Sequence, residues 1–352
     1  MEERELRNNW WFFFPLKGIH LKNNNHNIES PIFGDATIIA KIHVEQVVSM
    51  LNLDDKADKN KHASNITYMM RHATFYENFS TFIAVKRTGE LSEDKNRQRI
   101  IDSAILRGRE IASLLTIINL KNSNYKQTCG LVEQTRNKIR SLVVLNFSTG
   151  NFRFDTDGHR SFINEIDLIE LTYDDINNLL NNEKYYYLSK AIIEYNFLTG
   201  SIRRSISQSA NRLADAIHSV ELSAQVLGSV TSIEILLTEQ GDSFETIKRR
   251  IIALIGMNSY SSLSVDDVLN ARHIYVHRGK GIEDYDLALK SIMLGTNVII
   301  NFAELSTKGF KTKKQITDYL DLVYLANEYS KNMDYKLLEE LKRMYVAQRT
   351  EM

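Results

Sequence analysis

The stretch IRRSISQSANRLADAIHSVELSAQVLGSVTSIEILL, residues 202–237, carries most of what the sequence reveals about the fold. Its apolar residues recur at the three- and four-residue spacing of a helix that buries one face. We predict a long helical stretch here, interrupted near Gly228. The same helical pattern continues on both sides, so residues 183–352 are predicted to form an all-α bundle, large enough for a core of its own.

Six further helices are predicted within residues 183–352. Gly200 is the expected stop signal of the first helix. Asp242 with Glu245 is the expected capping box of the second, and Ser264 is the expected start of the third. In chain order the six helices cover residues 183–198, 242–256, a segment that starts at 264, and residues 285–305, 314–327 and 335–346.

Residues 1–182 are predicted to form a mixed α/β domain. Runs of β-branched and aromatic residues predict its strands, and Gly150 lies in the expected turn of a hairpin. One amphipathic helix, capped by Ser92, is predicted between the strands. The fold class is therefore α+β, with an N-terminal α/β domain followed by an all-α bundle. The predicted strands are residues 10–16, 36–42, 80–85, 142–147 and 152–154.

The composition excludes several classes of protein. At roughly 150 residues per domain, 352 residues suggest about two domains. The 44 basic and 44 acidic side chains leave no net charge, so the chain does not hold nucleic acid by bulk charge. The single cysteine, Cys129, excludes an intramolecular disulfide and a Cys-rich zinc site. No apolar run reaches the roughly 18 residues of a membrane span and no signal peptide is recognised, so a cytoplasmic protein without a membrane partner is expected.

The segment NARHIYVHRG, residues 270–279, is the strongest candidate for a functional site. It places Arg272 five positions before His277 near the end of a predicted helix. Two other Arg–His pairs with similar spacing occur in the chain, so the spacing alone is weak and the context decides. A Ser-Ile-Glu-Ile-Leu-Leu helix precedes this segment, and a long amphipathic helix follows it.

In these features, residues 200–330 resemble the HEPN superfamily, and within it the Apea-like branch. The usual His-Gly pair of that family appears here as His277-Arg278-Gly279, with an inserted arginine. The resemblance implies an antiparallel helical bundle that forms a homodimer, in which two copies of the motif face each other. Many such proteins are metal-independent endoribonucleases, often toxins or effectors of antiviral defence. The implied catalytic pair is Arg272 and His277, supported by His273, Tyr275 and Glu234.

The residue types suit RNA cleavage, because RNA carries its own nucleophile, the 2′-OH. A histidine can act as base or acid near neutral pH. An arginine stays charged and fits phosphate oxygens. The expected products are a 2′,3′-cyclic phosphate and a 5′-OH, and neither a metal nor a cofactor is predicted. Residues five apart on an ideal helix point about 140° from each other, so we expect the helix to end before His277, or each residue to serve a different face.

Structural interpretations of Arg272, His277 and Glu234 are alternatives to a catalytic role, and His273 can be a surface histidine. Basic residues at a helix C-terminus favour the negative end of the helix dipole, and Glu234 can form a purely structural salt bridge with Arg272. The alternative function is a non-catalytic, dimeric RNA- or nucleotide-binding or scaffold protein. The N-terminal domain is expected to sense a trigger, bind a regulatory partner or choose the RNA. A solvated face is the simpler explanation for the basic run at residues 248–250. The candidate RNA contacts are Arg278, Lys280, Lys248, Arg249 and Arg250.

Overall fold

The computed structural model divides the chain into two compact units, Met1–Leu180 and Asn181–Met352. The sequence places the boundary after residue 182. Each unit is considered by itself. The structure describes residues 9–17, 19–22, 32–40, 81–88, 94–119, 130–131, 142–146, 152–155, 169–219 and 221–329.

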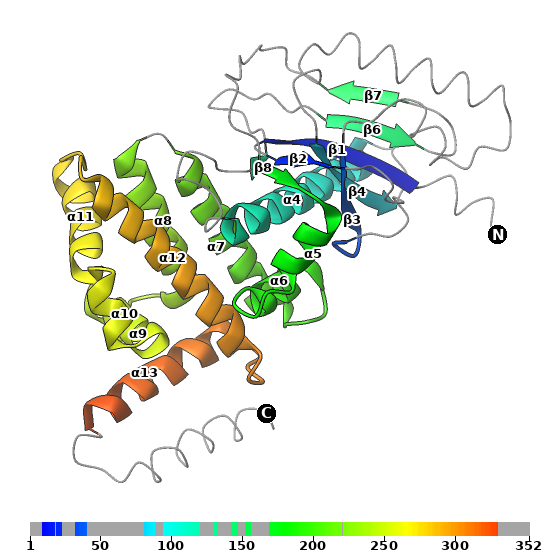
Figure 1. The fold of residues 1–352 in the computed structure, drawn as a ribbon. Coiled ribbons are helices and arrows are strands. Elements are labelled where there is room, and N and C mark those ends of the chain that lie inside the picture. Colours follow the sequence, from blue (N-terminus) through cyan, green and yellow to red (C-terminus); the bar gives the residue numbers. More distant parts are fainter. Residues whose placement is uncertain are drawn as a thin grey trace, which may run out of the picture. The chain divides into compact units, whose positions relative to one another are not determined.

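The first unit contains an antiparallel sheet with the strand order β3-β4-β1-β6-β7, and a short strand, β5, that also pairs with β1 (Figure 1). The predicted strands are present, and β6 and β7 pair as the predicted hairpin, with Leu145 opposite Phe152. The turn residue Gly150 lies outside the described residues. The strand bounds are β1 (Asn9–Lys17), β3 (Ala36–Ala40), β4 (Thr81–Thr88), β5 (Gly130–Leu131), β6 (Leu142–Asn146) and β7 (Phe152–Asp155).

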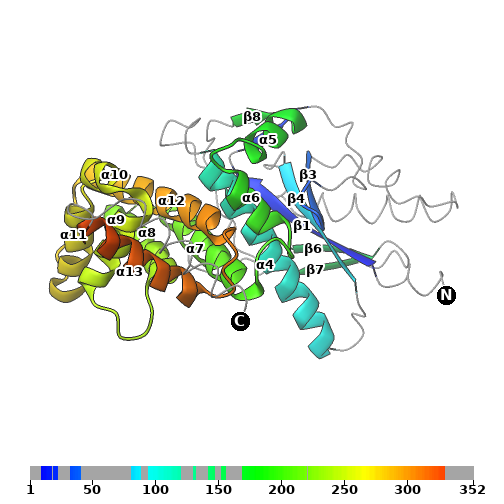
Figure 2. The same ribbon diagram turned by 90° about the horizontal axis from the view of Figure 1, so that it is seen from below.

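Alternation along β1 explains how the sheet contributes to a core. Phe12, Phe14 and Leu16 are all buried, because every second side chain of a strand points to the same face. Helix α4 (Asp94–Ile118) packs against β4, β5 and β1 (Figure 2). Its apolar stripe is the predicted one and includes buried Ala104 and Ile111, whereas Ser92, the expected cap, lies outside the described residues.

The sequence did not reveal a second, parallel sheet in this unit. Its strands are β2 (Ile19–Leu21) and β8 (Ile169–Leu171), which lie about 150 residues apart in the chain. Helix α5 (Tyr173–Leu180) follows directly, and the Tyr173 hydroxyl donates a 2.6 Å hydrogen bond to the Ile38 carbonyl. Burial raises the pKa of Tyr173 to about 12. The strands β2 and β8 have three residues each, which is too short for an alternating apolar and polar pattern to be visible in the sequence.

A buried charge network connects α4 to the strands. The Arg107 side chain is 1% exposed, and its guanidinium contacts Asp35 at 2.7 Å, Glu110 at 3.1 Å and the Phe33 carbonyl at 2.9 Å. Arg87 binds the second oxygen of Asp35. Burial alone would raise the pKa of Asp35, but the two guanidinium groups outweigh it and hold that pKa below its ordinary value. Among the described residues of this unit, Arg107 is a buried cation that joins α4 to Asp35 and to the Phe33 carbonyl.

The second unit is all-α over its described residues. Its core lies where α7, α8 and α12 pack together, and α11 packs on α8 and α12 (Figure 1). The helices are α6 (Tyr186–Ile193), α7 (Gly200–His218), α8 (Leu222–Leu237), α9 (Phe244–Ile255), α10 (Met257–Ser262), α11 (Val265–Arg278), α12 (Tyr285–Ser306) and α13 (Lys313–Tyr329). The predicted helix at residues 335–346 lies outside the described residues.

The prediction of one helix over residues 183–198 is wrong at its end. Helix α6 ends at Ile193, and Gly200 is the first residue of α7, not a stop signal. Thr199 precedes it as the N-cap, in an extended conformation, and its hydroxyl donates to the Lys311 carbonyl at 2.8 Å. A Thr-Gly pair suits the start of a helix as well as the end of one, so the local signal was ambiguous.

Helix α7 ends at His218 and α8 begins at Leu222, so the long helical stretch is interrupted between these residues instead of at Gly228. Ser219 ends α7 in an extended conformation, whereas Gly228 lies inside α8. A Cβ atom at Gly228 would lie 2.7 Å from the Ala216 Cβ. This glycine therefore allows α7 and α8 to approach each other closely, which is a packing requirement and not a helix break.

The predicted capping box at the start of α9 is displaced by one residue. Ser243 is the N-cap, and its hydroxyl accepts a hydrogen bond from the Thr246 N–H. Asp242 instead accepts from the Glu239 N–H and pairs with Arg250. Asp242 therefore binds the Glu239 N–H and Arg250, and Ser243 caps the helix in its place.

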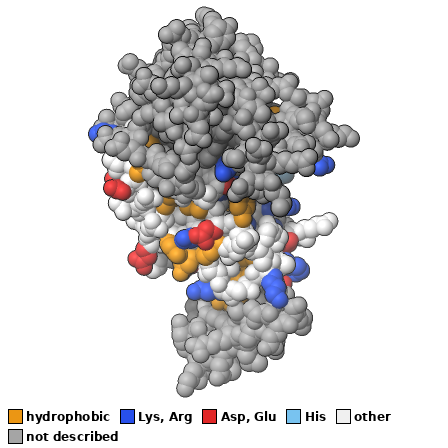
Figure 3. Space-filling view, turned by 90° about the vertical axis from the view of Figure 1, so that its right-hand side faces the viewer, with side chains coloured by type: hydrophobic (Ala, Val, Ile, Leu, Met, Phe, Trp, Pro, Cys, Tyr) orange, Lys and Arg blue, Asp and Glu red, His pale blue; other side chains and the backbone are white. Residues whose placement is uncertain are grey.

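Several large apolar side chains of the described residues are exposed, among them Tyr195, Met257 and Val276. Figure 3 shows one face of the molecule, where hydrophobic side chains reach the surface beside charged ones. Within the described ranges, none of the helices combines the length and the apolar character that crossing a bilayer requires.

Candidate functional site

Helix α11 carries the predicted motif. It begins after Ser264, as predicted, but Ser264 adopts a left-handed conformation with φ 49° and its side chain makes no cap hydrogen bond. The helix continues through His277 to Arg278 and ends at Gly279, whose φ of 64° suits glycine. The expectation that the helix ends before His277 is therefore wrong. The other expectation applies instead, because Arg272 and His277 lie on different faces of one helix.

Arg272 pairs with Glu234 on α8, a helix that lies before α9 and α10 in the chain. The guanidinium lies 2.9 Å from one carboxylate oxygen and 3.2 Å from the other. Both side chains are about one quarter exposed, at 25% and 22%. This contact joins two residues that are 38 positions apart, and it confirms that Arg272 is the partner of Glu234. The pair holds the arginine in one orientation while leaving part of it in contact with solvent.

His273 and His277 form a pair of imidazoles on the adjacent face. They are four positions apart, so the helix places them one above the other. Their ring centroids lie 4.4 Å apart with an interplanar angle of 49°. The Phe244 ring lies 6.5 Å from His273. Both histidines are exposed, so both ring edges can meet a solute.

The second half of α11 is only partly covered within the unit. The buried residues of this helix, Val265, Val268 and Leu269, all lie in its first half. Val276 is 48% exposed, and Tyr275 is half-buried. The motif therefore occupies the least covered part of the helix.

The candidate RNA contacts differ greatly in their surroundings. Arg278 and Lys280 are exposed at the end of α11 and in the following loop. Lys248 forms salt bridges with Asp266, at 2.8 Å, and with Glu245, at 3.3 Å. Hydrogen bonding to Asp266 raises the pKa of Lys248 despite the opposing effect of burial.

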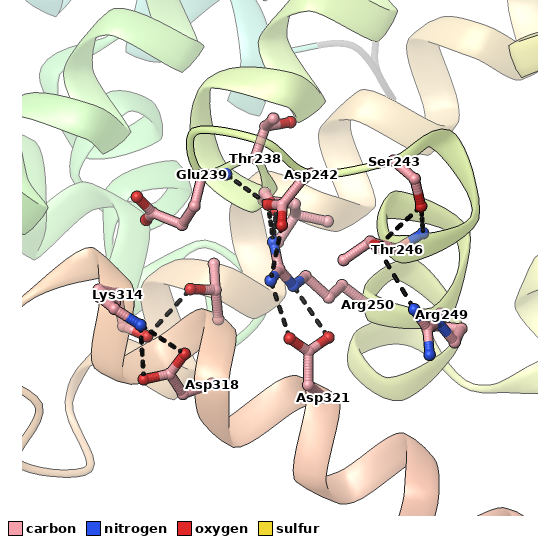
Figure 4. Close-up of polar contacts among 12 residues, drawn as sticks. Thr238, Glu239, Asp242, Ser243, Thr246, Arg249, Arg250, Lys314, Asp318 and Asp321 are labelled. Atoms are coloured by element: carbon pink, nitrogen blue, oxygen red, sulfur yellow. Dashed lines mark hydrogen bonds and ion pairs between the residues drawn. The ribbon is translucent and has the colours of Figure 1, made fainter.

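Arg249 and Arg250 are neighbours with different roles. The Arg249 guanidinium lies 6.0 Å from the centre of the Tyr324 ring and bonds to Thr246. Arg250 is 4% exposed and forms two hydrogen bonds with Asp321, at 3.0 and 2.8 Å, and a salt bridge with Asp242 (Figure 4).

The Arg250 guanidinium also donates to the Leu237 carbonyl at 2.6 Å. It therefore connects the C-terminus of α8, the start of α9 and the helix α13. The expectation that Arg250 binds RNA is corrected, because its guanidinium is buried and its donors are directed to these protein groups. The basic run at residues 248–250 thus contains one internal structural cation.

Sequence reasoning missed the residues that complete these contacts. Phe244 was not connected with His273, and neither Asp242 nor Asp321 was connected with Arg250. The i,i+4 spacing of His273 and His277 was visible in the sequence and is the one signal that could have found the histidine pair. Asp321 lies 71 positions from Arg250, beyond the reach of any local pattern.

Comparisons with known proteins leave the site to be judged on its geometry. No protein-family model, no curated protein and no solved structure matches the chain. Over the part of the chain that the structure describes, no group of three or more His, Cys, Asp or Glu residues is placed to hold a metal ion. The groups available for chemistry on α11 are therefore a guanidinium bound to a carboxylate and two exposed imidazoles.

Proposed function

We propose that the chain is a metal-independent endoribonuclease of the HEPN type whose active site is completed by a second copy. The observation that carries this proposal is the last two turns of α11. They present the Arg272 guanidinium, oriented by Glu234, together with the exposed imidazole of His277. A cation for the phosphate and a proton-transfer group for the hydroxyls are the two requirements of the reaction.

A second copy is needed because one protomer does not direct both groups to one phosphate. Arg272 and His277 point about 140° apart on the helix. A two-fold axis beside α11 would bring the histidine of one protomer toward the arginine of its partner. The exposed Val276 side chain on the same segment supports a contact surface here. Two imidazoles would then be available, one for each proton transfer.

The reaction balances without any other reactant. The imidazole of one protomer takes the proton of the ribose 2′-OH, and the oxygen attacks the adjacent phosphorus. The bond between phosphorus and the 5′-oxygen breaks, and the partner's imidazolium protonates the departing oxygen. Arg272 stabilises the charge on the non-bridging phosphate oxygens. The products are a 2′,3′-cyclic phosphate and a 5′-OH.

The test is cleavage of RNA by the purified full chain in EDTA, compared with variants H277A and R272A. General acid–base catalysis contributes about 10²–10⁴-fold, so the H277A variant should lose at least about 100-fold in rate. Asn270→Ala, an exposed polar change on the same helix, is the matched control and should keep full activity. Mass spectrometry of the products should find the cyclic phosphate.

Cleavage that disappears in EDTA, or that persists in both variants, would refute the proposal. An alternative is a non-catalytic dimer that binds RNA or acts as a scaffold. The Arg272–Glu234 salt bridge favours this alternative, because it gives the arginine a structural role within one protomer. The alternative predicts no cleavage by the wild type, with R272A and H277A still dimeric in analytical ultracentrifugation.

A further inference from the structure

The two imidazoles on α11 have the arrangement of a bidentate metal ligand. His273 and His277 lie one helical turn apart with ring centroids separated by 4.4 Å. A pair of histidines at positions i and i+4 of a helix places both rings on one face, where they can bind one metal ion. Imidazole nitrogen suits Zn²⁺, Ni²⁺ and Cu²⁺, whereas Mg²⁺ and Ca²⁺ prefer oxygen ligands.

We propose that His273 and His277 form a transition-metal site that takes Ni²⁺, Zn²⁺ or Cu²⁺. Each neutral ring offers one nitrogen lone pair, at a bond length of about 2.0–2.1 Å for zinc. The ring centroids already lie 4.4 Å apart, so rotation of the two exposed side chains is the only change needed to direct one nitrogen of each ring to a shared ion. Water fills the remaining coordination positions, so the ion stays open to other ligands.

Two features of the surroundings support the site. Both rings are exposed, so no buried polar group has to be displaced when the ion enters. Phe244 contacts the His273 ring from its own helix, α9, with centroids 6.5 Å apart. This contact limits the rotamers of His273 and therefore lowers the entropy that is lost when the ion binds.

Metal binding has a regulatory consequence that rests on the proposed function. The lone pair of His277 that binds the ion is the same lone pair that would accept the 2′-OH proton. Occupation of the site therefore makes the chain a metal-inhibited ribonuclease. An enzyme that needs no metal for its chemistry would lose activity when Ni²⁺ is added and regain it when EDTA is added.

The test is isothermal titration of the untagged full chain with NiCl₂, followed by MgCl₂ as the ion that should not bind. Losing a group that only orients a ligand costs 10–100-fold in affinity, so H273A and H277A should each bind nickel at least about tenfold more weakly. The chain has nine histidines, and the difference between variants isolates this pair. His20→Ala, in strand β2 of the other unit, is the control and should bind like the wild type.

The outcomes separate the metal site from the ribonuclease. Equal nickel binding by the wild type and both α11 variants would overturn the metal site, as would no binding by the wild type. Circular dichroism of each variant excludes loss of the fold as the cause. Because the titration contains no RNA, nickel binding without ribonuclease activity would retain the site and refute only the proposed function. Cleavage that is insensitive to nickel at saturating concentration would refute the regulatory consequence.

Discussion

Arg249 and Arg250 show how little a residue type reveals about its role. They are adjacent in a basic run, yet Arg250 is buried among two aspartates and a carbonyl, while Arg249 lies beside an aromatic ring. A helix turns by 100° per residue, so neighbours necessarily face different surroundings. Only the positions of Asp242 and Asp321 decide which arginine is internal.

We predict that R250A destabilises the protein by about 3 kcal/mol, because it leaves two carboxylates without their cation. The adjacent R249A variant should cost less than about 1 kcal/mol, since its contacts lie at the surface. Urea denaturation followed by circular dichroism measures both. Equal losses of stability in the two variants would show that the buried contacts of Arg250 stabilise the fold no more than the contacts of Arg249 do.

The contacts of Arg250 also predict that the free energy of unfolding decreases in acid. Burial alone would raise the pKa of Asp242, but the Glu239 N–H and the Arg250 guanidinium outweigh burial and hold the pKa below its ordinary value. A depressed folded-state pKa stabilises the fold above the unfolded value of about 3.9 and stops doing so as the pH falls through the folded value.

We therefore expect the free energy of unfolding to fall as the pH decreases below about 4. The D242N variant, which has no proton to gain, should show a shallower decrease and a lower stability at pH 7. Urea titrations between pH 7 and pH 2.5 test this. An identical slope in wild type and D242N would exclude Asp242 as a contributor.

At the scale of elements, the close contact of α7 and α8 depends on one glycine. A Cβ atom at Gly228 would come within 2.7 Å of the Ala216 Cβ and 3.3 Å of its Cα. Alanine has the higher helix propensity, but here overpacking outweighs that gain. We predict that G228A costs about 1–3 kcal/mol in urea denaturation.

Gly200 provides the matched control, because a Cβ atom there meets nothing within 4 Å. The G200A variant should be neutral or slightly stabilising, by up to about 1 kcal/mol. The comparison separates packing from backbone effects, since both glycines are helical. A stabilising G228A variant would mean that the helices can move apart without cost.

Only the features of the candidate site that lie within the single helix α11 could be predicted from the sequence. The position of the motif near the end of α11, and the i,i+4 spacing of its two histidines, follow from local sequence. The full extent of the helix does not, because Gly279 ends it two residues later than the chemistry of the motif suggested. The orientation of Arg272 depends on α8, which supplies Glu234.

At the scale of the whole molecule, two units with separate interiors lead us to expect two unfolding transitions. Arg107 is buried in the first unit and Arg250 in the second. We predict that R107A lowers the midpoint of one transition in differential scanning calorimetry, and that R250A lowers the midpoint of the other. A single transition that shifts in both variants would show that the units unfold together.

The sequence by itself determined the division into a mixed α/β part and a helical part, the hairpin, and most of the helices, because these follow from hydrophobic period over neighbouring residues. The structure decided the break between the end of α7 at His218 and the start of α8 at Leu222, the choice of Ser243 as cap, the burial of Arg250 and the pairing of Arg272 with Glu234. Arg250 and Arg272 are the clearest cases, because their partners Asp321 and Glu234 lie 71 and 38 positions away in the chain. The physical reason is that a buried charge must be paired and an interior must be close-packed, and both requirements can outweigh the local sequence preference.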